Sequence, residues 1–416
     1  MKKPVEIDVA SGYRGPVDIT RLDAAWNESV TTADIGSDEV TIDLSDAQYI
    51  DHESFLYLIA LIAMRDKLGQ KTSFVLPKSE KRLEALRCWD FFKTAELVSK
   101  SSFRNRLNAV DQKRLANLSQ RDPYFFKVVD DPNGGRESLL SETFFALTPV
   151  QLKAGAEEAA SIAKAKWLDR HVLDVLNFHL DGYGDRIATN VIYEGVLNAG
   201  KHPGASIAFT GSQLLAYPKP TGKPVGPNDT ELVISIWDDG QSFADTLLSA
   251  YERHGTVASP AFGLVEDVFE FDVIDRQDGS NNMSVVIESS SPIDQNAGYA
   301  ETMLSAFFLG TSSTPSRIPV STEQYAGVSD AWIPAAGRAY PGLGLHIIRK
   351  TVVDQFGGSL FYASGRYRLT IQPSDTGGGN RYVASMSCLR ETDAQLAGNL
   401  LIIRIALPAK PTASSD

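Results

Sequence analysis

The sequence predicts an α/β (α+β) protein built from two unequal units, and three observations support this class. The chain has 416 residues, and at about 150 residues per domain this length favours two or three domains. Hydrophobic residues make up 43% and charged residues 22%, a balance typical of folded proteins. Segments with the period of a strand alternate with segments of helical character. A wholly disordered chain is therefore excluded.

The first hundred residues alternate between strands and helices, which predicts a small α/β domain over residues 1–98. Gly69 is expected to end the first long helix, because glycine commonly follows a helix C-terminus. A polar, turn-rich stretch over 99–140 is expected to be a linker. The expected elements are a strand at 40–44, a helix at 54–67, a strand at 72–76 and a helix at 80–92.

A second, larger domain is expected over residues 141–408, with a loose tail at 409–416. Thr148, Pro149 and Gln151 form a capping-box pattern, which predicts a long helix from there to about residue 180. The further expected elements are a helix at 185–200, strands at 206–209 and 232–237, a helix at 345–356 and a strand at 400–407.

The net charge and the cysteine content restrict the cellular compartment and the kinds of binding partner that we expect. The formal net charge is −12, which argues against general nucleic-acid binding. Cys88 and Cys388 form no C-x-x-C pair, so a disulfide framework and a cysteine zinc site are excluded. The N-terminus lacks the apolar core of a signal peptide, and the longest apolar run, 55–64, is far below the ~20 residues that span a bilayer. We expect a cytoplasmic protein without a membrane segment.

The first chemically informative segment is 193–202. On a helix, Glu194, Asn198 and Lys201 are four and then three residues apart and share one face. A carboxylate can accept a proton, an amide oxygen suits Mg²⁺, and an ammonium meets phosphate as a point charge. Taken alone, the segment favours a solvated helix face with ordinary polar pairs.

The second segment is an apolar strand that ends at Asp238, with Gly240 two residues on. A buried aspartate at a strand end can accept a hydrogen bond from an exocyclic amine of a ligand. A simple Asp-Asp-Gly turn is the alternative interpretation of these residues.

The third segment runs through Gly342, Leu343, Gly344 and Leu345 into a helix. Glycines there let backbone N–H groups approach an anion at the helix start. The segment is not a Walker loop, since no G-x-x-x-x-G-K-[ST] occurs in the chain.

In this order, the three segments resemble the GHKL ATPases, which share the Bergerat nucleotide-binding fold, a mixed sheet with helices on one face. The resemblance covers about residues 141–408 and implies binding of ATP with Mg²⁺. Carried over, it makes Glu194 the general base, Asn198 the magnesium ligand and Asp238 the adenine-binding residue, with Gly240 beside it. It gives Lys201 a phosphate contact, and His202 either contacts the phosphates or ends its helix. The backbone from Gly342 through Leu343 and Gly344 to Leu345 would hold the phosphates.

Several features agree with this resemblance, and others depart from it. Residues 307–314 look like a lid motif of sensor kinases, which places Ser312 at the ATP site and an enlarged lid at about 241–341. Ser242 replaces the second glycine of the D-x-G-x-G box, and Thr314 replaces the lysine that ends the lid motif. These departures bear on turnover more than on binding.

The N-terminal domain resembles a STAS domain, the fold of anti-sigma-factor antagonists, through residues 40–45 and 49–54. Glu53 falls where that family carries its phosphorylated serine, and a shift of one residue would make Ser54 the acceptor. An acidic helix start is the other interpretation of Glu53. The resemblance implies a protein partner that binds through this domain.

These features together favour a Mg·ATP-binding ATPase that acts as a nucleotide-dependent switch. A Ser/Thr protein kinase of the anti-sigma-factor type and a non-catalytic nucleotide-binding scaffold are the alternatives. Analogy with relatives implies a homodimer.

Overall fold

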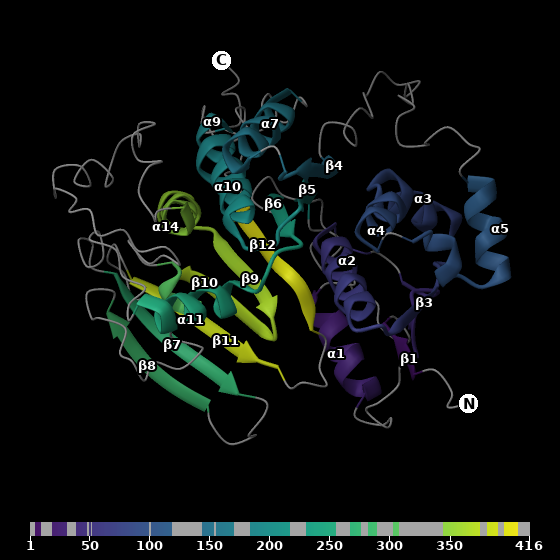
Figure 1. Cartoon of the computed structure of the whole chain (residues 1–416), viewed down its shortest axis with the longest axis horizontal. Coiled ribbons are helices and arrows are strands. Elements are labelled where there is room, and N and C mark those ends of the chain that lie inside the picture. Colours follow the sequence, from purple (N-terminus) through teal and green to yellow (C-terminus); the bar gives the residue numbers. More distant parts are fainter. Residues whose placement is uncertain are drawn as a thin grey trace, which may run out of the picture.

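A computed structural model of the chain contains two β-sheets accompanied by helices (Figure 1). The mixed α/β content expected from the sequence is thereby confirmed. Within the described part, no helix has the length and apolarity to cross a membrane. The structure describes residues 5–9, 19–30, 39–47, 50, 52–99, 101–118, 144–153, 155–169, 184–216, 230–254, 267–275, 282–288, 303–307, 344–374, 381–389 and 395–406.

The N-terminal unit is built on a small parallel sheet in the order β1-β2-β3. In β2, Val40 and Ile42 are buried and alternate with partly exposed neighbours, as the strand period predicts. The helix α2 ends before Gly69, whose φ is 73°, a left-handed conformation that glycine adopts without strain. The elements of this unit are β1 (Val5–Asp8), α1 (Ile19–Val30), β2 (Glu39–Asp43), α2 (His52–Lys67), β3 (Lys71–Val75), α3 (Glu80–Cys88) and α4 (Phe91–Ser99).

Two details of this unit differ from the sequence-based expectation. The single helix expected at 80–92 is two helices, because Asp90 adopts a φ of 57° and breaks the helical path. The described part of the expected linker, residues 101–118, is folded: it holds the 3₁₀ turn Phe103–Arg106 and the helix α5 (Ala109–Leu118). Phe103 and Leu115 are buried in the same core as α2 and α4.

The larger unit is built on a nine-stranded mixed sheet in the order β4-β5-β6-β12-β9-β10-β11-β7-β8. Neighbouring strands are antiparallel except β11 and β7, which are parallel. The strands are β4 (Phe144–Gln151), β5 (Ile207–Ala216), β6 (Thr230–Asp238), β7 (Val268–Asp275), β8 (Asn282–Glu288), β9 (Ser359–Gly365), β10 (Tyr367–Pro373), β11 (Arg381–Cys388) and β12 (Leu396–Ala406).

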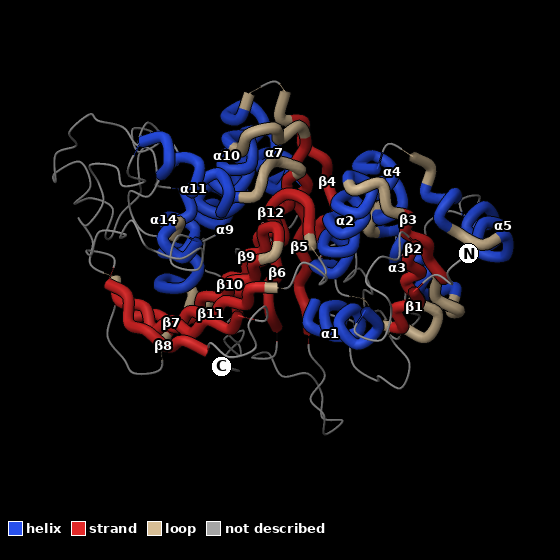
Figure 2. The backbone as a smooth tube through the Cα atoms, turned by 60° about the horizontal axis from the view of Figure 1, so that its bottom comes forward, coloured by secondary structure: helices blue, strands red, loops and turns tan. Residues whose placement is uncertain are grey.

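A helical layer shares one apolar core with one face of this sheet (Figures 1 and 2). Two of its helices contain π-helical turns, Ala188–Tyr193 directly before α10 and Lys350–Gln355 directly after α14. The α-helices of this layer are α7 (Ala156–Asp169), α9 (Gly184–Ile187), α10 (Glu194–Lys201), α11 (Phe243–His254) and α14 (Gly344–Arg349).

The helix α2 of the N-terminal unit lies against β12, β6 and β5, and Figure 2 shows it beside the large sheet. Its buried residues form one core with Trp237, Leu400 and Ile402. Along their strands, these three residues alternate with residues that point to the other face of the sheet, into the core under the helical layer. The sheet expected to carry helices on one face is therefore covered by the N-terminal unit on its second face, over β5, β6 and β12. The apolar run 55–64 belongs to α2, so its unusual apolarity is explained by this double burial.

The capping-box prediction at Thr148 was wrong. Residues 144–151 form the strand β4, and the following helix, α7, begins only at Ala156. The aromatic and β-branched residues of this stretch favour a strand, and β4 is an edge strand, where Pro149 is tolerated. The short capping motif was thus outweighed by pairing with β5.

The region expected to be an enlarged lid, 241–341, contributes regular structure to the sheet. It contains α11 as well as β7 and β8, which extend the sheet beyond β11. Residues 303–307 are buried in the helical-layer core. The rest of that region and the expected tail at 409–416 lie outside the described residues.

Candidate functional site

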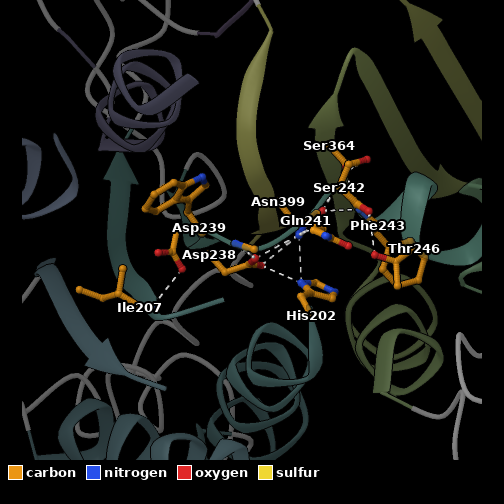
Figure 3. Close-up of polar contacts among 12 residues, drawn as sticks. His202, Ile207, Asp238, Asp239, Gln241, Ser242, Phe243, Thr246, Ser364 and Asn399 are labelled. Atoms are coloured by element: carbon orange, nitrogen blue, oxygen red, sulfur yellow. Dashed lines mark hydrogen bonds and ion pairs between the residues drawn. The ribbon is translucent and has the colours of Figure 1, made fainter. Parts of the chain in front are cut away.

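Asp238 ends β6 and is 3% exposed, which makes its carboxylate the buried centre of a polar cluster (Figure 3). Its Oδ1 accepts the backbone N–H of Gly240 at 2.9 Å and the amide of Asn399 at 3.1 Å. Its Oδ2 lies 3.0 Å from Nδ1 of His202. We assign the proton of this contact to Nδ1, because an ionised carboxylate oxygen can only accept.

The orientation of Asn399 is fixed by its neighbours. Its Oδ1 accepts the backbone N–H of Phe243 at 2.8 Å and the hydroxyl of Ser364 at 2.7 Å. Its Nδ2 donates to the carbonyl oxygen of Gln241 at 2.9 Å and to Asp238. Because a backbone N–H can only donate, the acceptor side of the amide must face Phe243, and the donor side must face Asp238.

Asp239, the neighbouring aspartate, has a different structural role. Its carboxylate accepts the backbone N–H groups of Ser206 at 2.6 Å and Ile207 at 3.0 Å, so it closes the turn between α10 and β5. The two adjacent carboxylates therefore point to different partners, as Figure 3 shows. Only Asp238 belongs to the cluster with His202 and Asn399.

Glu194, Asn198 and Lys201 lie on α10, as predicted. The side chains of Glu194 and Asn198 are half-buried, whereas Lys201 is exposed. The helix packs against α7 and α14 and contacts β5 and β6, so it lies between the strand-end aspartate and the third predicted segment.

The side chain of Asn198 is in contact with Gly344. A Cβ at position 344 would lie 2.5 Å from Asn198 Nδ2 and 2.6 Å from its Oδ1, closer than non-bonded atoms approach. The glycine therefore leaves the space that the Asn198 side chain occupies beside α14. Asn198 Nδ2 is buried and has no hydrogen-bond partner among the described residues.

The helix α10 thus joins two of the predicted segments within about one helical turn. His202, which caps α10, contacts Asp238, and Asn198, four residues earlier, contacts Gly344. Four residues along a helix correspond to about 6 Å. The three segments singled out from the sequence therefore meet at the C-terminal end of α10.

The π-helical turns hold α10 and α14 in register. Asn190 Nδ2 donates to Thr351 Oγ1 at 3.1 Å, and Arg186 donates to Gln355 Oε1 at 3.3 Å. Each bond joins the helix that leads into α10 to the helix that follows α14. Such π-helical turns are frequent at functional sites.

The structure brings together only part of the predicted site. Asp238, Gly240, His202, Asn198 and Gly344 are joined through α10 as described. Leu345 begins the buried face of α14 and is 8% exposed. Three predicted site residues lie outside the described residues, namely Ser312, Gly342 and Leu343.

Sequence reasoning missed the two polar strand residues that organise the cluster, Asn399 and Ser364. The signal was present, because Asn399 precedes a dense apolar strand and Ser364 ends another. In the sheet, Asn399 is paired with both Asp238 and Ser364, which sets the three side chains in one row. This register depends on pairing between strands that are far apart in the sequence, so no local motif predicts it.

A second buried polar group lies on the other side of α14. Arg349 is fully buried and forms an ion pair with Asp267, and its guanidinium lies 4.3 Å from the ring centroid of Tyr382. Lys350 Nζ is 3.2 Å from Asp267 Oδ1. Burial, together with the positive charges of Arg349 and Lys350, holds the pKa of His346 well below its usual value.

Metal-binding capacity in the described residues is limited. No group of three or more His, Cys, Asp or Glu side chains that could hold a metal ion occurs in the described part of the chain. Magnesium commonly takes few protein ligands and completes its shell with water and substrate phosphates. The amide oxygen of Asn198, whose side chain lies beside Gly344, fits a site of that kind.

Three comparisons with known proteins were made. No family model matches the chain. Neither a curated protein nor a solved structure matches it.

Proposed function

We propose that this protein binds Mg·ATP in the manner of the GHKL ATPases and hydrolyses it slowly as a nucleotide-dependent switch. One observation carries the proposal: within about one turn, α10 contacts the strand-end aspartate through His202 and the glycine segment through Asn198. A nucleotide offers a base at one end and phosphates at the other, so it matches a site with these two ends.

Asp238 is suited to recognise the base. A carboxylate has about four acceptor positions. Gly240 and Asn399 occupy two of them on Oδ1, and His202 occupies one on Oδ2. The other position on Oδ2 holds only the long contact of Asn399 Nδ2, at 3.4 Å, which a closer donor such as the exocyclic amine of adenine would replace.

Asn198 and Lys201 are suited to the phosphate end. When bound, Mg²⁺ would neutralise phosphate charge and polarise the terminal phosphoryl group. The amide oxygen Oδ1 of Asn198 would hold the ion. The buried and unpaired Nδ2 of the same amide is a donor, so it is suited to a phosphate oxygen. The exposed ammonium of Lys201 can reach phosphates that extend into solvent.

Glu194 is the proposed general base. It precedes Asn198 by one turn of α10, so its carboxylate belongs to the same helix face. It would accept a proton from the water that attacks the terminal phosphorus, as the bond to the leaving ADP oxygen breaks. The products are ADP and inorganic phosphate.

The kinase alternative requires an accessible hydroxyl acceptor. We also propose that the N-terminal unit is a STAS-like domain. Its two candidate acceptor positions are not accessible, because Ser54 is fully buried and Glu53 is 3% exposed and paired with Arg404. Glu53 faces the large sheet through Arg404, and the hydroxyl of Ser54 is shielded by burial, so neither position offers a reachable acceptor. Burial of this site favours hydrolysis over phosphorylation of the protein's own N-terminal unit.

Titration calorimetry with ATP and magnesium tests the proposal, with Asp238→Asn as the variant and Asp239→Asn as its control. Loss of the charged acceptor at position 238 should weaken ATP binding at least tenfold, about 1.4 kcal/mol. Asp239→Asn should lower stability and leave ATP affinity nearly unchanged, since Asp239 holds a turn. Absence of ATP binding to the unmodified chain, or equal affinity loss in both variants, would contradict the proposal.

Labelled γ-phosphate then separates the modes of action. Release of inorganic phosphate supports the ATPase, and label on protein supports the kinase. Binding without either result supports the scaffold.

A further inference from the structure

Tyr362 lies on the same face of the sheet as Asp238, one row further along the strands. Asn399 is paired with Asp238 on one side and with Ser364 on the other. Two residues further along, Leu401 is paired with Ile236 and with Tyr362. Because side chains two residues apart point to the same face, Tyr362 lies beneath the helical layer next to the polar row.

The hydroxyl of Tyr362 is buried and has no hydrogen-bond partner among the described residues. Burial raises the pKa of this phenol well above its usual value, and the charge of Asp238 raises it further. The group is therefore a neutral hydroxyl near that carboxylate. An unpaired buried hydroxyl costs free energy, so a reason for its retention is needed.

Phe243 connects Tyr362 to the Asp238 cluster. Its backbone N–H donates to Asn399 and to Ser364. Its ring contacts the ring of His202 edge-on, with centroids 5.6 Å apart, and the ring of Tyr362, with centroids 6.1 Å apart. The residue that fixes the orientation of Asn399 thus also packs against Tyr362.

Phe307 also packs against Tyr362, with ring centroids 5.7 Å apart. Phe307 and Phe243 both contact the tyrosine ring edge-on, so two aromatic contacts hold the ring in place. A side chain held in this way cannot easily turn to find water. Its hydroxyl is preorganised for one partner.

We propose that Tyr362 is a further base-recognition residue, whose hydroxyl donates to a ring nitrogen of the purine held by Asp238. The inference rests on the proposed function, because it assigns a second contact within the same site. Asp238 has one acceptor position held only by a contact of 3.4 Å from Asn399, and the hydroxyl of Tyr362 has its donor open. The matching ligand must therefore present a donor and an acceptor side by side.

Adenine meets this requirement, because its 6-amino group is flanked by the ring nitrogens N1 and N7. Hypoxanthine held in the same orientation places the oxygen at position 6 against Asp238, so the carboxylate has no donor to accept from. Sites built to pair polar groups reject analogues that leave those groups unpaired. A base held in this orientation by Asp238 and Tyr362 is accordingly a 6-aminopurine.

A purely structural role for Tyr362 makes the opposite prediction. If the hydroxyl were only tolerated in the core, Tyr362→Phe would leave ATP affinity unchanged. If the hydroxyl bound a structural water, the same change would lower the stability of the ligand-free protein. The proposal instead expects weaker ATP binding without a loss of ligand-free stability, because an unpaired polar group is removed.

The test compares the full chain with Tyr362→Phe and with Tyr57→Phe as a matched control. Tyr57 is also buried, but its hydroxyl donates to Asp23 in the N-terminal unit. Tyr57→Phe should lower the melting temperature and keep ATP affinity. Tyr362→Phe should keep or raise the melting temperature and weaken ATP binding about fivefold, as loss of one neutral hydrogen bond implies.

Analogues identify the partner atom. The unmodified chain should bind either 7-deaza-ATP or 1-deaza-ATP about fivefold more weakly than ATP, and Tyr362→Phe should abolish that difference. Unchanged ATP affinity in Tyr362→Phe, or an analogue preference that survives the substitution, overturns the inference alone. Failure of the unmodified chain to bind ATP overturns the proposed function itself.

Discussion

The amide of Asn198 and the backbone of Gly344 are in direct contact, although they belong to different helices. The three atoms nearest to a Cβ at position 344 would be Nδ2, Oδ1 and Cγ of Asn198, all at the end of that side chain. A larger residue there would displace that side chain rather than the helix. The contact therefore links the size of residue 344 to the position of the proposed magnesium ligand.

The first prediction concerns Gly344→Ala. The added methyl group should push the Asn198 amide aside while the fold persists. We expect ATP affinity in the presence of magnesium to fall about tenfold, and affinity without magnesium to change little. Calorimetric titrations with magnesium and with a chelator measure both values.

A double-variant cycle provides the control for this prediction. If the methyl group acts through Asn198, Gly344→Ala should cost no further affinity once Asn198 is alanine. An equal loss in both backgrounds would show that position 344 affects binding independently of Asn198.

The second prediction concerns Glu194→Gln, which keeps the shape of the side chain and removes its basicity. ATP affinity should stay within about twofold, and phosphate release should fall about 10²–10⁴-fold, the usual contribution of a general base. The exposed acid Glu157 on α7 is the matched control, and Glu157→Gln should change neither quantity. Turnover that survives Glu194→Gln would assign the base elsewhere.

Much of the fold follows from local sequence signals. The alternation in β2 and the glycine after α2 predicted their elements correctly, because burial and backbone conformation there depend on nearby residues. The apolar strand before Asp238 and the helix around Asn198 were predicted for the same reason. Local patterns thus identified the elements that carry the site.

The parts that local patterns missed depend on distant partners. Asn399 gains its role only because β12 is paired with β6 and β9 in one register. Arg349 and Asp267 become an ion pair only where α14 packs over the sheet. At Thr148, pairing with β5 outweighed a capping motif that is plausible in isolation. Strand register and packing decided each case.

The third prediction concerns the pH dependence of stability through His346. Its pKa is lower in the folded protein than in the unfolded chain, where the ordinary value is 6.5. Below that value the unfolded chain binds a proton that the folded protein does not, so stability falls as pH drops. Between pH 7.5 and 5.5, this group should remove about 1 kcal/mol of stability.

Urea unfolding of the native chain and of His346→Gln at both pH values isolates this contribution. Glutamine keeps an acceptor for Arg349, which approaches His346 Nδ1 at 3.1 Å, but it does not titrate. The variant should lose about 1 kcal/mol less than the native chain on acidification. Parallel losses in the two proteins would mean that His346 takes up its proton equally in the folded and unfolded states.

The fourth prediction concerns the contact between the N-terminal unit and the large sheet. Arg404 on β12 pairs with Glu53 on α2 and, at 3.0 Å, with Glu231 on β6. The Glu53 side chain is 3% exposed, so its charge is shielded from water and depends on its protein partners. The surrounding apolar residues of both units form one core, so the ion pair lies at the edge of a shared interior.

Arg404→Met should therefore destabilise the whole chain rather than one unit. We expect a loss of about 2–3 kcal/mol, at the lower end for a broken buried pair, because the Arg404 side chain retains 30% exposure. Lys71→Ala is the control: it breaks an ion pair with Glu39 whose side chains are 63% and 41% exposed, and it should cost less than about 1 kcal/mol. Calorimetry should record a single transition at a lower temperature for Arg404→Met. Two separate transitions, or a cost no greater than that of Lys71→Ala, would show that the units fold independently and that α2 rests on the sheet without stabilising it.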